Sequence, residues 1–100
     1  KTYKGITATA GGFYGPQGRV LRLPLQDSEL NTQINSFNYN GHKVSNLEME
    51  TSAIYGLSKL LGHNAISMNA IIANRANEVF SENADKVIED LILYTIDRMI

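Results

Sequence analysis

The chain has 100 residues, of which 43% are hydrophobic, and its 9 Lys and Arg nearly balance its 10 Asp and Glu. This length supports one domain with a modest core, and the formal net charge of −1 argues against nucleic-acid binding, because such proteins usually carry a basic excess. The absence of Cys excludes disulfides and thiolate metal sites, and no apolar run reaches membrane-spanning length, so we expect a cytoplasmic protein that binds no membrane.

The chain begins with an expected strand followed by a glycine-rich loop. Residues 1–8 place apolar side chains between small or polar ones, which is typical of a strand. Five of the eight glycines lie between Gly5 and Gly18, so the backbone that follows the strand is expected to turn tightly. We therefore expect a ligand-binding loop in this stretch.

The next part of the chain predicts a short extended segment and a helix. Residues 20–25 form the extended segment, which Pro24 ends. Asp27 or Ser28 can then cap a helix that stops within residues 38–41. One face of this helix carries the apolar residues Leu30, Ile34 and Phe37.

The second half of the chain alternates predicted strands and helices. Residues 44–49 predict a strand, and residues 51–61 predict a helix that ends at Gly62. The apolar run at 65–73 is typical of a strand buried on both faces of a sheet. The last helix is predicted from about residue 83 to the end of the chain, because apolar residues recur there at helical spacing: Ile88, Leu91, Ile92, Ile96 and Met99.

The strand at 44–49, the helix after it and the strand at 65–73 predict a right-handed crossover between parallel strands. Ligands of such units bind at the carboxyl ends of the strands. Residues 48–50 end the first strand and residues 73–75 end the second. Two candidate site segments are therefore expected to share one edge of a sheet.

The first motif with clear chemistry lies in the loop at residues 13–19. Gln17 offers one acceptor and two donors on a planar amide, and Arg19 offers a forked set of donors. Together they match a base edge that alternates carbonyl and N–H groups, as uracil does. Gly, Pro and polar neighbours are also ordinary turn chemistry, so a tight turn without a ligand is the alternative.

The second motif is the tripeptide at residues 48–50. A carboxylate from Glu48 or Glu50 can accept hydrogen bonds from vicinal sugar hydroxyls while Met49 lies against the apolar face of the sugar, which indicates ribose. Glu50 also precedes a predicted helix, whose positive end favours the ionised carboxylate. The alternative is that the acidic residues only complement the helix dipole and that Met49 fills a core.

These motifs resemble those of the nucleoside phosphorylase-I superfamily and, within it, the uridine phosphorylases. The resemblance runs through residues 5–8, 13–19, 46–50 and 71–75, and so along nearly the whole chain. It implies an α/β fold, a three-layer α/β/α sandwich around a mixed, twisted central sheet. Residues 1–100 would be the C-terminal segment of a single domain without its N-terminal part, and the whole protein would be a homo-oligomer, either a dimer or a hexamer.

The resemblance implies phosphorolysis of uridine to uracil and ribose 1-phosphate, with inorganic phosphate as co-substrate and with no cofactor and no metal. Gln17 and Arg19 would stabilise the charge that develops on the departing base, and Glu50 would hold the ribose hydroxyls, so these three are the expected catalytic residues. The remaining substrate-binding residues would be Phe13, Glu48, Met49, Ile72 and Ala73, with Phe13 stacked on the base or walling it off.

Residues 72–75 leave several alternatives open. Ile72 and Ala73 are most simply core residues at a strand end, although the resemblance places them at the base pocket. Arg75 could pair with Glu78 or reach the base through water. Purine-acting relatives place an aspartate where this chain has Asn74, and an amide cannot protonate a departing purine, which favours a pyrimidine substrate.

The phosphate site of this family uses a glycine-containing loop and arginines that have no match in this chain, and neither Arg22 nor Arg98 is an obvious phosphate clamp. We therefore expect the 100-residue chain alone to be inactive and, with apolar faces uncovered, to oligomerise. The alternatives are a purine nucleoside phosphorylase or nucleosidase of the same superfamily, and a non-catalytic nucleoside-binding or oligomerisation module.

Overall fold

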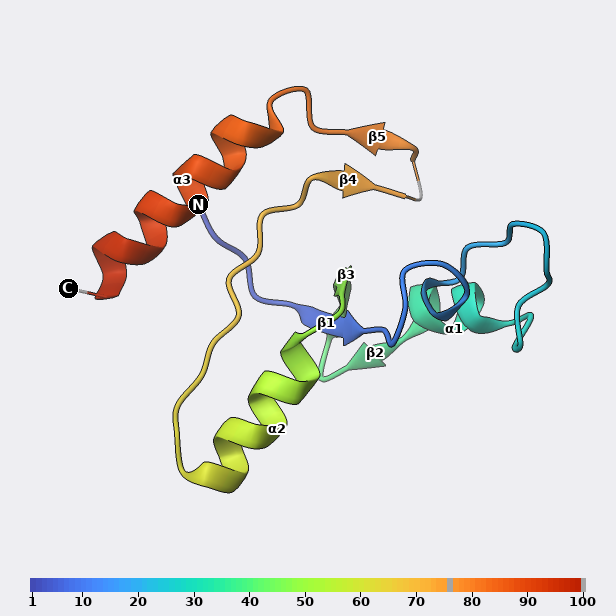
Figure 1. Cartoon of the computed structure of the whole chain (residues 1–100), viewed down its shortest axis with the longest axis horizontal. Coiled ribbons are helices and arrows are strands. Elements are labelled where there is room, and N and C mark those ends of the chain that lie inside the picture. Colours follow the sequence, from blue (N-terminus) through green and yellow to red (C-terminus); the bar gives the residue numbers. More distant parts are fainter. Residues whose placement is uncertain (76, 100) are drawn as a thin grey trace. The chain divides into compact units, whose positions relative to one another are not determined.

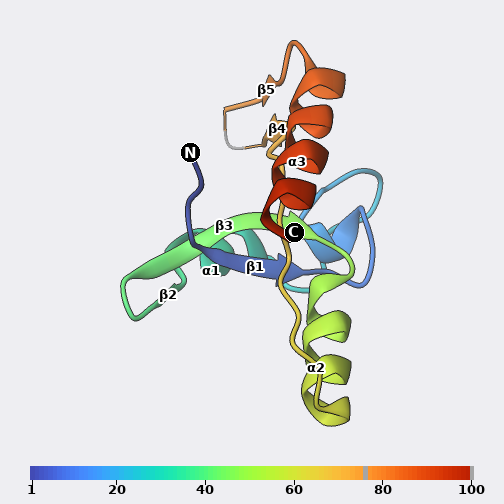
Figure 2. The ribbon, with the colours of Figure 1, turned by 90° about the vertical axis from the view of Figure 1, so that its left-hand side faces the viewer.

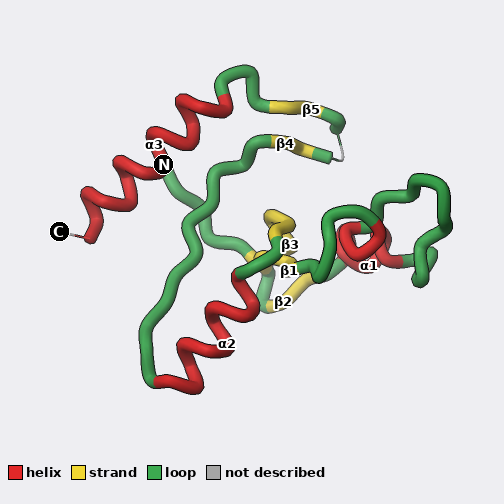
Figure 3. Tube along the Cα trace, viewed as in Figure 1, coloured by secondary structure: helices red, strands yellow, loops and turns green. Residues whose placement is uncertain are grey.

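The computed structural model describes residues 1–75 and 77–99. The chain forms two compact units, Lys1–Ala65 and Ile66–Ile100. Each unit combines strands and helices, whose order along the chain can be followed in Figure 1 and whose extents are coloured in Figure 3. The chain is thus a mixed α/β structure, as predicted.

A three-stranded mixed sheet forms the centre of the first unit. Strand β1 (Ile6–Thr9) pairs with strand β3 (His42–Glu48) in parallel, and strand β2 (Asn38–Tyr39) pairs with the other edge of β3 in antiparallel. Figure 2 shows β1 and β3 running side by side. The expected strand at 44–49 is confirmed, whereas the strand expected at 1–8 begins only at Ile6.

Three helical segments connect or follow these strands. The short 3-10 helix η1 (Gly15–Gln17) lies in the glycine-rich loop, and α1 (Leu30–Ser36) precedes β2. Helix α2 (Thr51–Leu61) has the predicted bounds and ends at Gly62, whose φ of 74° is left-handed. The helix expected after Asp27 is confirmed as α1, although it begins at Leu30 and ends before Phe37. Its N-cap is Glu29 and not, as expected from the sequence, Asp27 or Ser28.

The second unit is a hairpin followed by a long helix. Strands β4 (Ala73–Asn74) and β5 (Val79–Phe80) pair in antiparallel, and the Ser81 N–H donates to the Ile72 carbonyl at 2.6 Å. Helix α3 (Ala84–Met99) confirms the last predicted helix, whose expected end at residue 100 lies outside the described residues.

Two expected extended segments are wrong. Residues 20–25 contain a bend at 21–23 but no strand, and no strand covers 65–72 in the described part of the chain, so the predicted strand–helix–strand unit is not formed. An apolar run reports only a preference for burial, whereas a strand also needs a neighbour for its backbone N–H and C=O groups. The parallel neighbour of β3 is instead β1, which lies before it in the chain.

No hydrophobic side chain of the described residues is fully buried. The predicted apolar face of α2 remains open, with Leu57, Leu60 and Leu61 all more than half exposed. An apolar hollow of about 310 Å³ also opens between α1 and the β1–β3 pair.

In the part of the chain that the structure describes, no helix has the length and hydropathy that a membrane span requires.

Candidate functional site

The carboxyl ends of β1 and β3 meet at one edge of the sheet. Thr9 pairs with Glu48 in the parallel register, and the Ala10 N–H donates to the Glu48 carbonyl at 2.9 Å. The glycine-rich loop follows β1 directly, and the 48–50 tripeptide ends β3. The two sequence motifs therefore lie at the same edge of the sheet, which is where ligands of parallel α/β sheets bind.

The loop at residues 13–19 is closed by its own backbone. The N–H groups of Gln17 and Arg19 both donate to the Tyr14 carbonyl, at 3.1 and 3.0 Å, and the Gly18 N–H donates to the Gly15 carbonyl at 2.8 Å. Gly18 has a φ of 81°, a left-handed value that favours glycine. The tight turn expected as an alternative is present, and it brings the side chains of Gln17 and Arg19 together.

Three of the residues predicted to bind the base form one contact group, which we call the base cluster: Phe13, Gln17 and Arg19. Arg19 Nη1 donates to Gln17 Oε1 at 2.7 Å and also to the Phe13 carbonyl oxygen. The guanidinium carbon lies 3.8 Å from the centroid of the Phe13 ring. Gln17 is only 5% exposed, whereas Phe13 is 51% exposed, so the cluster combines a buried polar side chain with a half-exposed aromatic ring.

Gly18→Ala is expected to disrupt the base cluster. A Cβ atom at Gly18 would require the unfavourable left-handed backbone and would collide with the Asn31 side chain, whose Nδ2 donates to the Gly18 carbonyl at 2.9 Å. We expect a loss of at least about 1 kcal/mol in the free energy of unfolding, measured by urea denaturation. Gly11→Ala is the matched control, because a Cβ there meets no atom within 4 Å. Equal stability of the two variants would contradict this.

The Glu48 carboxylate accepts hydrogen bonds from neighbouring groups of the protein. Oε2 accepts from the N–H groups of Glu50 and Thr51, both at 2.7 Å, and Oε1 accepts from the Thr9 hydroxyl. Partial burial raises the pKa of the Glu48 carboxyl group, but these hydrogen bonds and one from the Thr51 hydroxyl outweigh it and lower the pKa from 4.5 to about 2. Glu48 is therefore an ionised acceptor at the start of α2.

The Glu48 carboxyl group is accordingly expected to titrate near pH 2. Since its folded pKa lies below the usual 4.5, the ionised group stabilises the fold above about pH 4.5, and this stabilisation is lost as the pH falls towards 2. The carbon-13 shift of the Glu48 carboxyl carbon, followed against pH, measures the midpoint directly. Thr9→Val should raise the midpoint because it removes one donor, and a midpoint at or above 4.5 in the unmodified protein would contradict the assignment.

Met49 and Glu50, which we call the sugar pair, stand open beside Glu48. Met49 is 42% exposed, and Glu50 is exposed and makes no side-chain cap hydrogen bond to α2. The Glu50 carbonyl accepts from the Ile54 N–H at 3.2 Å, so its backbone belongs to the helix start. The sugar pair can thus present a carboxylate and a thioether to a ligand.

The other predicted site residues lie in the second unit. Ile72 and Ala73 belong to the hairpin segment, where Ala73 pairs with Phe80. Their expected place at the base pocket stays a prediction. Arg98 donates to Asp97 at 3.1 Å and its guanidinium carbon lies 4.0 Å from the Tyr94 ring centroid, so its contacts are local to α3.

Sequence reasoning missed the threonines of β1. The Thr7 hydroxyl donates to Asn46 Oδ1 at 2.7 Å, and Thr9 contacts Glu48 in the same way two residues later. The signal was present as two Thr two positions apart on one strand and two polar acceptors two positions apart on the other. Because side chains alternate along a strand, equal spacing places both pairs on one face.

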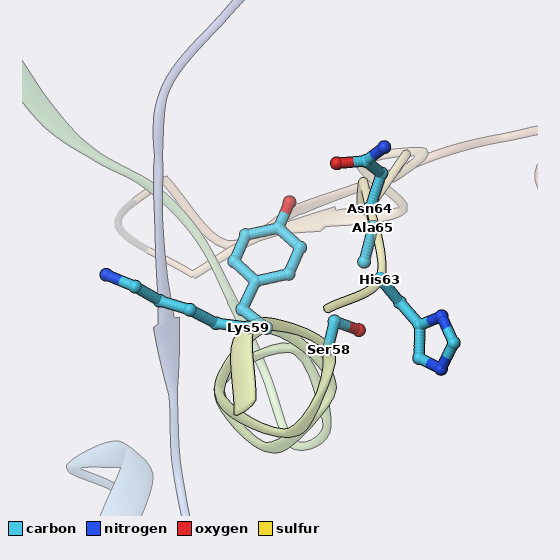
Figure 4. Close-up of a pocket in the computed structure, with 6 residues that line it drawn as sticks. Ser58, Lys59, His63, Asn64 and Ala65 are labelled. Carbon is cyan, nitrogen blue, oxygen red and sulfur yellow. The ribbon is translucent and has the colours of Figure 1, made fainter. Parts of the chain in front are cut away.

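A further hollow of about 250 Å³ lies at the C-terminal end of α2. Figure 4 shows that the Lys59 side chain and the His63 ring extend to opposite sides of it. No residue of the base cluster or the sugar pair lines this hollow or the apolar one beside α1. Among the described residues, no three His, Cys, Asp or Glu side chains gather as metal ligands.

The family model described as "Phosphorylase superfamily" matches residues 1–99. This range includes both motifs and all of the two units except residue 100. No curated protein and no solved structure matches the chain.

Proposed function

The chain belongs to the phosphorylase superfamily, and from this premise we propose that it carries the base- and ribose-binding residues of a uridine phosphorylase. The observation that supports the proposal most strongly is the base cluster, in which Arg19 holds the buried Gln17 amide and lies over one face of the half-exposed Phe13 ring. These polar groups would bind the edge of uracil, and the open aromatic ring would lie against its face.

The hydrogen-bond capacity of the base cluster fits uracil. Gln17 Oε1 uses one lone pair for Arg19 and keeps a second for the N3–H of the base, while its amide N–H groups can donate to a ring carbonyl. Arg19 keeps donors beyond the Nη1 group that holds the loop. As negative charge moves onto the departing uracil, these donors bind it more strongly, which lowers the barrier.

The sugar pair would hold the ribose. The Glu50 carboxylate would accept hydrogen bonds from the sugar hydroxyls, and Met49 would pack against the apolar face of the ring. Phosphate oxygen then bonds to the anomeric carbon with inversion while the bond to uracil breaks, and uracil leaves with the bonding electrons. The products are uracil and ribose 1-phosphate. Fixing the sugar beside the base would keep the reacting centre aligned.

A pyrimidine substrate is favoured by the residue at the hairpin. Asn74 ends β4, and its Oδ1 accepts from the Asn77 N–H at 3.3 Å. An amide in this position cannot supply the proton that a departing purine needs, whereas uracil leaves as an anion with its charge on carbonyl oxygens. Inosine turnover faster than uridine turnover would favour a purine nucleoside phosphorylase instead.

We also propose that these residues form the C-terminal segment of one phosphorylase domain and that the protein is a homo-oligomer. The lack of a fully buried hydrophobic side chain in the described residues supports this, because uncovered apolar faces need another polypeptide surface. The purified 100-residue chain is expected to release no uracil from uridine and phosphate, since it carries no recognisable phosphate clamp. Phosphate-dependent uracil release by this chain would contradict the proposal.

A further inference from the structure

The start of α2 is tied to both parallel strands through one carboxylate. Glu48 accepts from the Thr9 hydroxyl and from the N–H groups of Glu50 and Thr51. The Thr9 hydroxyl oxygen in turn accepts from the Ser52 N–H at 3.0 Å. We call this group of contacts the strand–helix junction. It joins the end of β1, the end of β3 and the first turn of α2.

The strand–helix junction fixes the backbone on both sides of Glu50. Its own N–H and the N–H of the next residue, Thr51, point at the same carboxylate oxygen, each at 2.7 Å. With both flanking peptide units held, the direction of the Cα–Cβ bond of Glu50 is set. The contact from Glu48 to the Glu50 N–H also closes the short turn that contains Met49.

The Glu48 carboxylate has no capacity left for a sugar. A carboxylate offers about four lone-pair sites. The donors are the Thr9 hydroxyl, two backbone N–H groups and the hydroxyl of Thr51, which is only 5% exposed. A ribose hydroxyl could bind Glu48 only by displacing one of these groups and leaving it unpaired.

We propose that Glu48 and Thr9 are positioning residues, which aim Glu50 at the ribose, and that Glu50 alone of the two acidic residues binds the sugar. This inference rests on the proposed function. In the 48–50 tripeptide, Glu48 is then a structural hydrogen-bond acceptor, Met49 a residue that packs against the sugar and Glu50 the ribose ligand.

The test uses the natural protein that contains this chain, with the variants Thr9→Val, Thr9→Ser and Glu48→Gln. Thr9→Val and Glu48→Gln are each expected to raise KM for uridine about tenfold, the size of one lost charge-assisted hydrogen bond. The inhibition constant of free uracil should change less than about twofold, because the base cluster is untouched. Thr9→Ser keeps the hydroxyl and should restore KM.

Two results would overturn the positioning role. An unchanged KM in Thr9→Val would show that the junction does not direct Glu50. Weaker uracil binding in parallel with the rise in KM would show a general loss of structure instead. If Glu48 bound the sugar directly, Glu48→Gln would raise KM while Thr9→Val did not.

A second readout separates failure of this inference from failure of the proposed function. The amide proton shifts of Glu50 and Thr51 should lie in the hydrogen-bonded range and move upfield in Glu48→Gln. If the unmodified protein neither turns over uridine nor binds uracil, both the proposed function and the ribose-binding role of Glu50 are wrong, whether or not the amide proton shifts of Glu50 and Thr51 move. If it does turn over uridine and the shifts do not move, only the positioning role is wrong.

Discussion

Arg19→Ala is expected to lower kcat/KM for uridine by at least about a hundredfold in the natural protein, the range seen when one preorganised donor to a developing charge is removed. Arg19 donates to the Gln17 amide oxygen at 2.7 Å and to the Phe13 carbonyl oxygen, and its guanidinium group lies over one face of the Phe13 ring. The substitution therefore removes a donor to uracil and also releases the buried amide beside it. Initial rates of uracil release over a range of uridine concentrations measure the effect.

Two further variants make this result specific. Arg22→Ala removes the same charge from an exposed position three residues along and should leave kcat/KM within about twofold of the unmodified value. Arg19→Lys keeps the charge but loses the planar fork, so it should recover only part of the activity. Equal losses in Arg19→Ala and Arg22→Ala would mean that the net charge, and not the base cluster, matters.

Glu50→Gln is expected to lower kcat/KM for uridine by about ten- to a hundredfold. The amide keeps the shape of the side chain but replaces an ionised acceptor with a neutral one, and hydrogen bonds to charged groups are worth about 1.5–3 kcal/mol. The matched control is Glu82→Gln, an exposed position in the second unit. Binding of free uracil, which has no sugar, should be unchanged in both variants.

The comparison of uridine and uracil decides what Glu50 does. A loss confined to uridine identifies Glu50 as the ribose ligand. A parallel loss of uracil binding would instead indicate that Glu50 supports the loop structure, and an undiminished kcat/KM for uridine would remove it from the site altogether.

The features predicted correctly from the sequence are those that local chemistry determines. Helix α2 has an apolar stripe at helical spacing and Gly62 directly after it, so its bounds were predictable to the residue. The base cluster could be predicted in the same way, because Phe13, Gln17 and Arg19 all lie within residues 13–19. The binding roles of its residues stay predictions.

The features missed depend on partners far along the chain. The apolar run at 65–73 has a strand-like pattern but gives no information about a neighbouring strand. Of its residues only Ala73 belongs to a strand, β4, which pairs with β5. Glu48 was recognised as an acidic residue at a helix start, but its donor Thr9 lies 39 positions earlier. Only the parallel register of β1 and β3 brings that hydroxyl to the carboxylate and so makes Glu48 part of the strand–helix junction.

We propose that the carboxyl edge of β1 and β3 belongs to a phosphorylase that acts on uridine. The most direct test is the phosphate dependence of nucleobase release by the purified natural protein, with uridine and inosine as matched substrates. We predict uracil release that requires phosphate and greatly exceeds hypoxanthine release. Faster release of hypoxanthine, or release of either base without phosphate, would contradict it.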